Sequence, residues 1–254
     1  MLRKIFQTGS VLYLFFIGFG SSLLAVSTQA ADEQTVRARL EALANSEHRS
    51  ESLRARNPYR HPVETLLFFE LRPDQTVVEI WPGGQGGWYR SILEPFLQAS
   101  GTYIPVPDDS AFPGPLEEVP DGIADRVLVF RAHGFLIYDK PLLSYYAALY
   151  RMLKPGGIFG IVDHREFETR EQDPKSENGY VKESYVIALA ESVGFEFVEK
   201  SEINANPLDT KDYPDGLYSL PPVLKGTFFN RSLREKVLAI GESDRMTLKF
   251  RKPL

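Results

Sequence analysis

Short apolar runs alternate with longer amphipathic segments over most of this 254-residue chain. Residues 76–80 (TVVEI), 124–132 (ADRVLVFRA) and 158–164 (IFGIVDH) are rich in Val, Ile, Leu and Phe, as expected for strands covered on both faces. Between them, residues 88–99 and 142–153 have helical periodicity. Because strands that alternate with helices form βαβ units, the pattern predicts a doubly wound α/β fold with a mostly parallel sheet.

Further elements complete this order. Additional strands are predicted at residues 102–106, 196–203 and 245–252. Additional helices are predicted at residues 32–56, 61–71, 179–195 and 232–240. The first of these is expected on the surface and to end at Asn57-Pro58. Helix 142–153 should end at the Lys154–Gly157 turn. We expect its residues on one side to be Leu143, Ala147, Tyr150 and Leu153.

The N-terminus has the layout of a secretory signal peptide. A positive start (MLRK) precedes an apolar run, and Thr28 and Ala30 would occupy the −3 and −1 positions of a cleavage site. We therefore expect cleavage near Ala30, a periplasmic or secreted protein, and membrane contact only through this segment. The alternative is an uncleaved anchor, although the apolar run of about 16 residues is shorter than the roughly 20 needed to span a bilayer. Residues 31–57 would form a helical lead-in, and residues 58–254 one domain.

Composition excludes several classes of protein and site. The chain has no cysteine, so disulfides and thiolate chemistry are excluded. Its net charge of −5 gives no basis for nucleic-acid binding. The four histidines show no zinc-ligand spacing, so we expect no metal site. The sequence also lacks a G-x-S-x-G elbow and a P-loop.

A glycine-rich turn, EIWPGGQGGWY, joins the strand at residues 76–80 to the following helix. Glycines at such a turn allow backbone N–H groups to approach a ligand closely, and ligands of open α/β sheets bind outside the carboxyl ends of the strands. Glu79 lies at that end and could accept a hydrogen bond from a ligand's ammonium group. The alternative is that the turn is rich in glycine only because it is tight.

Polar residues follow three other predicted strands. Asp108 and Asp109 come after the second strand, where carboxylates hold ribose hydroxyls in nucleotide-binding folds or simply form turns. His133 follows the third strand, and Asp163, His164 and Arg165 follow the fourth. A side chain at either place could act as a general base or could only cap a loop.

Taken in order, several segments resemble those of class I S-adenosylmethionine-dependent methyltransferases. The most specific is LYRMLKPGGIFGIVD, which is similar to the helix, Pro-Gly-Gly turn and strand of these enzymes. The resemblance covers roughly residues 58–252. Within the superfamily the chain looks closest to a group of exported, uncharacterised methyltransferases. Features similar to that group's signatures are RHPVETLLFFELRP, EIWPGG, VDHR, NPLD and SDRMTLKFRKP.

The resemblance implies a seven-stranded sheet whose last strand is antiparallel, with the methyl donor over the glycine turn. Donor-binding residues implied by the match are Glu79, Gly83, Gly84, Gly87, Asp108 and Arg131. His133 and Asp163 are the implied catalytic residues, and S-adenosylmethionine is the implied cofactor. The substrate would be a small molecule or a component of the cell envelope.

The sequence departs from the superfamily pattern at two places. The glycine turn is about two residues longer, with Gln85-Gly86 inserted, and Trp81 replaces a common glycine. The short stretch 107–124 lacks room for the third strand and its flanking helices, which supply the adenine pocket in the superfamily. An alternative function is therefore a catalytically inactive binding protein of the envelope that keeps the fold. A nicotinamide-dependent oxidoreductase fits less well, because the turn lacks G-x-G-x-x-G spacing.

Overall fold

A computed structural model describes residues 20–83, 87–131, 134–137 and 141–254 of the chain. The chain divides into two units, residues 1–36 and residues 37–254. In its described part the first unit consists of the N-terminal portion of helix α1 (Gly20–Asn45), and the second unit contains the sheet and the other helices. Among the described residues, no helix combines the length and the apolar character that a membrane span requires.

The second unit is built on one mixed sheet. Its strands are β1 (Thr76–Ile80), β2 (Thr102–Val106), β3 (Ala124–Phe130), β4 (Leu153–Glu166), β6 (Glu196–Ser201) and β7 (Arg245–Arg251). Their order is β2-β1-β3-β4-β7-β6, and the two-residue strand β5 (Val181–Lys182) pairs with the end of β4. Strands β2, β1, β3 and β4 are parallel, whereas β7 is antiparallel to both β4 and β6.

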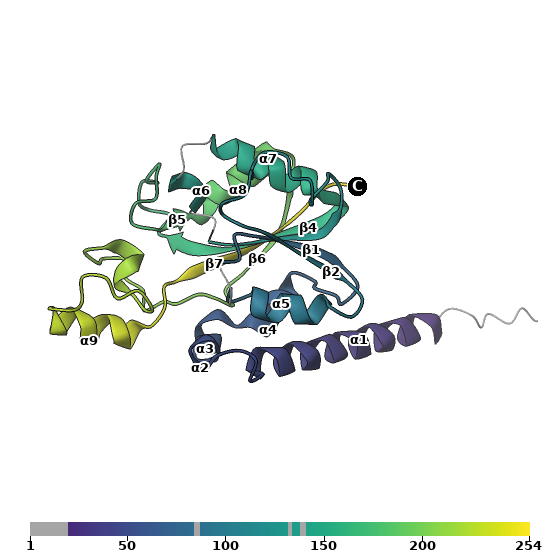
Figure 1. Cartoon of the computed structure of the whole chain (residues 1–254), viewed down its shortest axis with the longest axis horizontal. Helices are drawn as coiled ribbons and strands as arrows, with labels where there is room; N and C mark the ends of the chain where they lie inside the picture. Colours follow the sequence, from purple (N-terminus) through teal and green to yellow (C-terminus); the bar gives the residue numbers. More distant parts are fainter. Residues whose placement is uncertain (1–19, 84–86, 132–133, 138–140) are drawn as a thin grey trace, which may run out of the picture. The chain divides into compact units, whose positions relative to one another are not determined.

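Helices cover both faces of this sheet (Figure 1). One face carries α4 (Pro62–Phe68) and α5 (Arg90–Leu97), with the short helices α2 (Glu51–Arg54) and α3 (Asn57–Arg60) nearby. The other face carries α6 (Gly134–Ile137), α7 (Leu142–Met152) and α8 (Glu183–Ser192). The doubly wound α/β prediction is therefore confirmed.

The core shows why these segments form buried strands. Val127, Phe159 and Leu248 are fully buried on three neighbouring strands, and burial of each such side chain stabilises the fold by roughly 1.5–3 kcal/mol. Gly160 on β4 allows α4 to approach, because a Cβ at this position would lie 2.7 Å from the ring of Phe69. The position therefore requires the smallest residue.

The predicted loss of the third strand is also confirmed. After β2, all of residues 107–123 are described, and they contain only an isolated bridge between Leu116 and Val119. β2 is consequently the edge of the sheet. The segment still contributes to the core through Phe112, which is 3% exposed.

One local prediction was wrong. The helix expected at residues 32–56 ends at Asn45, and Asn57-Pro58 begins helix α3, because proline is well tolerated in the first turn of a helix. Helix α7 ends at Met152, directly before the Lys154–Gly157 stretch as predicted, and β4 already begins at Leu153. Leu143 is 49% exposed, so the side of α7 that carries it is not the buried one. The buried residues of that helix are Tyr145, Tyr146, Ala148, Leu149 and Met152.

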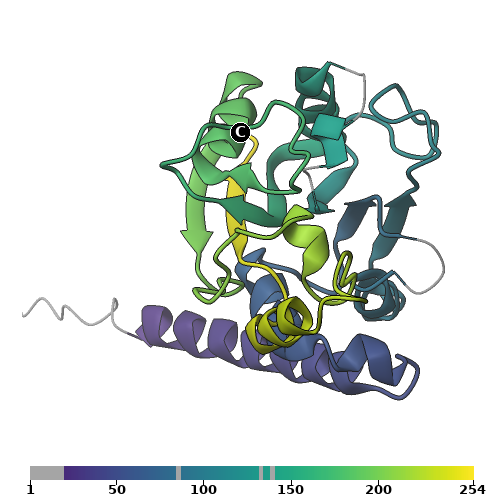
Figure 2. The same cartoon turned by 90° about the vertical axis from the view of Figure 1, so that its left-hand side faces the viewer.

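A long connection between β6 and β7 holds the 3₁₀ helix η1 (Gly216–Ser219) and α9 (Arg231–Ile240). The predicted helix at residues 232–240 is thus confirmed. Figure 2 shows this yellow-green connection beside the blue α2–α3 segment. An ion pair joins the two regions, since Arg60 Nε lies 3.0 Å from Glu242 Oε2.

Candidate functional site

A cleft of about 380 Å³ opens at the edge of the sheet where β1, β3 and β4 end and β7 begins. Its walls come from the glycine turn, the α2–α3 segment and the β6–β7 connection. The lining residues are Leu53, Arg56, Arg60, Glu79, Trp81, Pro82, Gly83, Gly87, Trp88, Tyr89, Phe130, Arg131, His164, Leu217, Tyr218, Pro221, Pro222, Val223, Ser243 and Arg245. This is the edge at which ligands of open α/β sheets bind.

The glycine turn forms one end of the cleft. Trp81 N–H donates a hydrogen bond to the carbonyl of Val106 at 2.8 Å, which ties the start of the turn to β2. Gly83 has a φ of +81°, a conformation that favours glycine. A Cβ at Gly87 would lie 2.1 Å from the carbonyl oxygen of Pro82, so the two sides of the turn approach too closely for any side chain. Backbone conformation thus favours glycine at position 83, and close packing requires it at position 87.

Glu79 presents a buried carboxylate to the same end. It is 2% exposed, and Tyr103 Oη donates a hydrogen bond to its Oε2 at 2.7 Å. Burial raises the pKa of Glu79 to about 7, although the hydrogen bond from Tyr103 and the charge of Arg131 act in the opposite direction. A cationic group placed in the cleft would lower this pKa, because it would stabilise the ionised carboxylate.

Aromatic rings form the floor of the cleft. Tyr89 stacks on Phe130 with 3.5 Å between ring centroids and an interplanar angle of 8°. Tyr89 Oη donates a hydrogen bond to the carbonyl of Arg60 at 3.3 Å. The guanidinium carbons of Arg49 and Arg60 lie 4.9 and 5.0 Å from the Trp88 ring. These contacts hold the floor between Glu79 and the α3 segment in one arrangement.

The other end of the cleft is rich in arginine. Arg56 and Arg60 each direct Nε to a different carboxylate oxygen of Glu242, and Arg245 hydrogen-bonds to Glu242 through Nη2. Glu242 is 3% exposed and Arg245 is 6% exposed. Burial alone would raise the pKa of Glu242, but the neighbouring guanidinium groups outweigh burial and lower that pKa to about 2.

His164 lies on β4 between the two ends and lines the cleft. Its Nδ1 shares a hydrogen bond with Ser243 Oγ, and this contact fixes the orientation of the imidazole. The neighbouring Asp163 is 1% exposed and accepts a hydrogen bond from the backbone N–H of His164 at 2.8 Å. Asp163 adjoins a separate cavity of about 20 Å³ rather than the main cleft.

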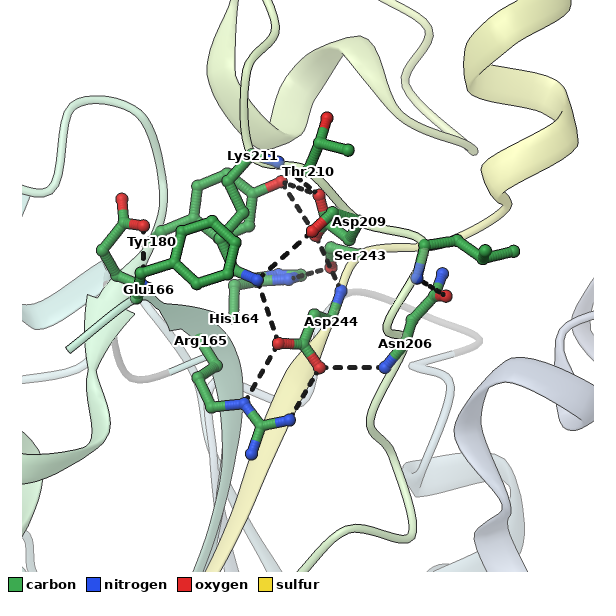
Figure 3. A network of polar contacts seen from close by, with 12 residues as sticks. His164, Arg165, Glu166, Tyr180, Asn206, Asp209, Thr210, Lys211, Ser243 and Asp244 are labelled. Atoms are coloured by element: carbon green, nitrogen blue, oxygen red, sulfur yellow. Dashed lines mark hydrogen bonds and ion pairs between the residues drawn. The ribbon is translucent and has the colours of Figure 1, made fainter. Parts of the chain in front are cut away.

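A buried polar network holds the β6–β7 connection against the ends of β4 and β7 (Figure 3). Asp244 accepts hydrogen bonds from Arg165 at 2.9 and 3.0 Å and pairs with Lys211 Nζ at 3.1 Å. Asp209 accepts bonds from the hydroxyls of Tyr180 and Tyr213 and from the backbone N–H of Asp244. Ser243, the partner of His164, directly precedes Asp244 and is therefore positioned by this network.

The cleft contains some of the predicted site residues and not others. Glu79, Gly83, Gly87 and Arg131 line it. Asp108 lies on the exposed loop after β2 and is not among the lining residues. Gly84 and His133 lie outside the described residues.

Sequence reasoning did not select several residues of the cleft. His164 was expected near the site as one of the polar residues after the fourth strand, and it lines the cleft. Among the residues that were missed are Arg56, Arg60, Tyr103, Ser243 and Arg245. Ser243 could have been found, because it belongs to the quoted segment SDRMTLKFRKP. The sequence indicated Tyr103 only weakly. Pro105 pairs with Glu79 across the two strands, and Tyr103 lies two residues before Pro105 on the same strand, so its side chain can reach Glu79 diagonally.

Arg60 and Arg245 belong to the quoted segments RHPVETLLFFELRP and SDRMTLKFRKP. Their meeting at Glu242 could not be found, because Arg56 and Arg60 are distant from Glu242 and Arg245 along the chain.

The region beyond β1 and β3 is packed with aromatic side chains. The ring of Trp81 contacts Phe135 at 4.9 Å, Tyr145 at 6.0 Å and Phe112 at 6.3 Å between centroids. Phe112 comes from the shortened segment after β2. The chain's own side chains therefore fill part of the space beside the glycine turn.

Among known proteins, this chain matches solved structures only. No protein-family model and no curated protein sequence matches this chain. An S-adenosylmethionine-dependent methyltransferase of Aquifex aeolicus matches with 18% identity and a TM-score of 0.46, over 66% of this chain and 93% of that one. The [4+2]-cyclase SpnF matches with 14% identity and a TM-score of 0.46, over 77% of this chain and 80% of that one.

The strand order is that of a Rossmann-like methyltransferase fold without its third strand. Because a fold does not by itself specify a function, we base the proposed function on the residues of the cleft.

Proposed function

We propose that this protein is an S-adenosylmethionine-dependent methyltransferase that acts on a small molecule or a component of the cell envelope. The observation that carries the proposal is Glu79, a buried carboxylate at the end of β1 that faces the cleft beside a glycine turn. Buried carboxylates with a raised pKa are found preferentially at functional sites, and a cationic ligand bound next to Glu79 would stabilise its ionised form. The donor carries both an ammonium and a sulfonium cation.

The residues at this end of the cleft fit the donor's amino-acid part. Glu79 would accept hydrogen bonds from the ammonium group. The backbone at Gly83 and Gly87 has no side chains that would prevent close approach. When bound, the donor supplies an electrophilic methyl group. The chain's own contribution to such a reaction is chiefly to position the reactants and exclude water.

His164 is the residue that we propose for proton removal from the substrate. It lines the cleft, and Ser243 holds its Nδ1, so its ring has a defined orientation. Imidazole is the side chain best suited to general-base chemistry near neutral pH. His133 and Asp163 stay predictions for this role.

Calorimetric titration of the folded protein with S-adenosylmethionine and its demethylated product tests the proposal. We expect Glu79→Gln to weaken binding by about tenfold or more, because a charge-assisted hydrogen bond would be lost. Glu191→Gln, on the exposed face of α8, is the matched control and should bind as the wild type does. Absence of binding to folded wild-type protein at millimolar donor would contradict the proposal.

The pH dependence gives a second readout. Glu79 has to ionise to hold a cation, so donor affinity should rise as pH increases from 5.5 to about 7 and then level off. The Glu79→Gln variant should show no such rise. Equal affinity of the wild type across this range would show that Glu79 does not meet the donor's cation.

A binding protein without methyl transfer is the second candidate. The observation that favours it is the aromatic packing of Phe112 and Trp81 beside the turn, together with the position of Asp108 away from the cleft. In that case the folded protein would bind a ligand in the cleft but neither the donor nor its product.

Export to the periplasm or outside the cell is also part of the proposal, on the signal-peptide pattern of residues 1–30. The mass of the protein recovered from its native compartment tests this. Cleavage near Ala30 predicts a mature chain that begins at Ala31. Recovery of the full-length chain from the membrane fraction would instead indicate an anchor.

A further inference from the structure

We infer that the arginine end of the cleft is an oxyanion site, which holds a phosphate or carboxylate group carried by the substrate. The claim that the anion belongs to a substrate rests on the methyltransferase proposed above. The claim that these residues bind an anion depends only on their own geometry. We call Arg56, Arg60, Arg245 and Glu242 the arginine cluster.

The formal charges of the arginine cluster do not balance. Three guanidinium groups share the single carboxylate of Glu242, which leaves two positive charges without a matching carboxylate within the cluster. The side chains of Arg56, Arg60 and Arg245 are only 24%, 16% and 8% exposed, so water compensates these charges incompletely. An anion in the cleft would balance the excess.

Two guanidinium groups are oriented so that their Nη atoms can donate hydrogen bonds to a ligand. Arg56 and Arg60 both use Nε to reach Glu242, and within the described part of the chain this is the only side-chain hydrogen bond of either residue. A guanidinium has five N–H donors, so the four on the Nη atoms of each remain available. The Nη fork is the part of arginine that matches an oxyanion in bidentate geometry.

The cluster is also distant from the glycine turn. Arg245 begins β7, and β3 and β4 lie between β7 and β1 in the sheet. Three steps between neighbouring strands, at about 4.8 Å each, separate the two ends of the cleft by roughly 14 Å. A donor held by Glu79 at one end therefore leaves the cluster to a second ligand, and His164 on β4 lies between them.

The surroundings hold the cluster in place before any ligand binds. Arg60 stacks on Trp88, and Arg245 Nη1 donates to the carbonyl of Tyr59 at 3.3 Å. Burial, followed by the charge of Arg245, lowers the pKa of Arg60 to about 10, and the negative charge of a bound anion would act in the opposite direction. A site arranged in advance loses little side-chain entropy on binding.

Titration of the full-length protein with inorganic phosphate, without any donor, tests the anion site. We expect saturable binding to the wild type and a dissociation constant raised at least about tenfold in Arg56→Gln, because one of the forks is lost. Arg231→Gln is the matched control, since its side chain is 92% exposed on α9. Arg56→Lys keeps the charge without the fork and should bind phosphate with intermediate affinity.

The outcomes separate the two proposals. Phosphate binding that survives Arg56→Gln unchanged, or no phosphate binding by the folded wild type, overturns the anion site. Competition between phosphate and the demethylated donor also overturns it, because the cluster would then hold the donor's own carboxylate. Simultaneous binding of both supports it. Phosphate binding without any donor binding leaves the anion site standing and removes the methyltransferase function.

Discussion

Tyr103 and Glu79 lie on neighbouring strands, and the hydroxyl of Tyr103 donates a hydrogen bond to the Glu79 carboxylate at 2.7 Å. The contact supplies a hydrogen bond to a carboxylate that burial removes from water. The pKa of Tyr103 is raised in turn, mainly by burial and further by the charge of Glu79 and by this hydrogen bond. The pair connects the edge strand β2 to the end of the cleft where we place the donor.

The first prediction concerns the stability of the protein as pH changes. The folded pKa of Glu79 is about 7, above its ordinary value of 4.5, so the folded state retains a proton that the unfolded state releases between these values. This group therefore makes the free energy of unfolding fall as pH rises from 4.5 to 7, by up to about 3 kcal/mol.

Urea denaturation across this pH range measures the effect. In the Glu79→Gln variant the free energy of unfolding should no longer fall between pH 4.5 and 7 on account of this residue, whereas the Glu191→Gln variant should show the same fall as the wild type. A fall of equal size in Glu79→Gln would show that other groups are responsible.

The second prediction concerns Glu242. Its pKa is lowered to about 2, so the stability that it contributes is present above pH 4.5 and is lost as pH falls toward 2. We expect Glu242→Gln to lower the free energy of unfolding at neutral pH by about 3 kcal/mol, because one buried and two partly buried guanidinium groups would lose their shared carboxylate. Adding Arg56→Gln should recover part of this loss, since one excess positive charge is removed. A double variant less stable than Glu242→Gln would contradict the shared-carboxylate account.

The third prediction concerns the polar network around Asp209. Asp209→Asn would place amide hydrogens opposite donors that now meet a carboxylate, so we expect a loss of about 3 kcal/mol in unfolding free energy. Hydrogen exchange should accelerate first in the β6–β7 connection, which this network holds. Asp212→Asn, whose side chain is 70% exposed, is the control and should change stability little. Unchanged exchange rates in Asp209→Asn would show that other contacts hold the connection.

The fourth prediction separates two reasons for glycine in the turn. Gly87→Ala would place a Cβ 2.1 Å from a carbonyl oxygen, so we expect a loss of about 1–3 kcal/mol and weaker donor binding. At Gly83, with a φ of +81°, the nearest atom to a Cβ is 3.8 Å away, so Gly83→Ala should lose only about 1 kcal/mol through backbone strain. Chemical denaturation and titration with the demethylated donor measure both variants. Equal stability of Gly87→Ala and wild type would mean that the turn adapts.

Much of the fold follows from patterns within a few residues of each position. The strand at residues 76–80 has the predicted bounds, because five consecutive residues of TVVEI pack into a sheet covered on both sides. The absence of a third strand also follows locally, since the Pro-, Gly- and acid-rich residues after β2 cannot form one. Leu143 shows the limit of such patterns, because periodicity identifies an apolar stripe without identifying the face that meets the sheet.

The two ends of the cleft differ in how far apart their residues lie along the chain. Glu79, Gly83 and Gly87 stand close together in the chain at a strand-to-helix turn, so their neighbourhood is encoded by local sequence. Arg56 and Arg60 meet Glu242 and Arg245 only because antiparallel β7 begins at the edge where the parallel strands end. Contacts between residues more than 180 positions apart depend on how the whole sheet is assembled, and no local pattern specifies them.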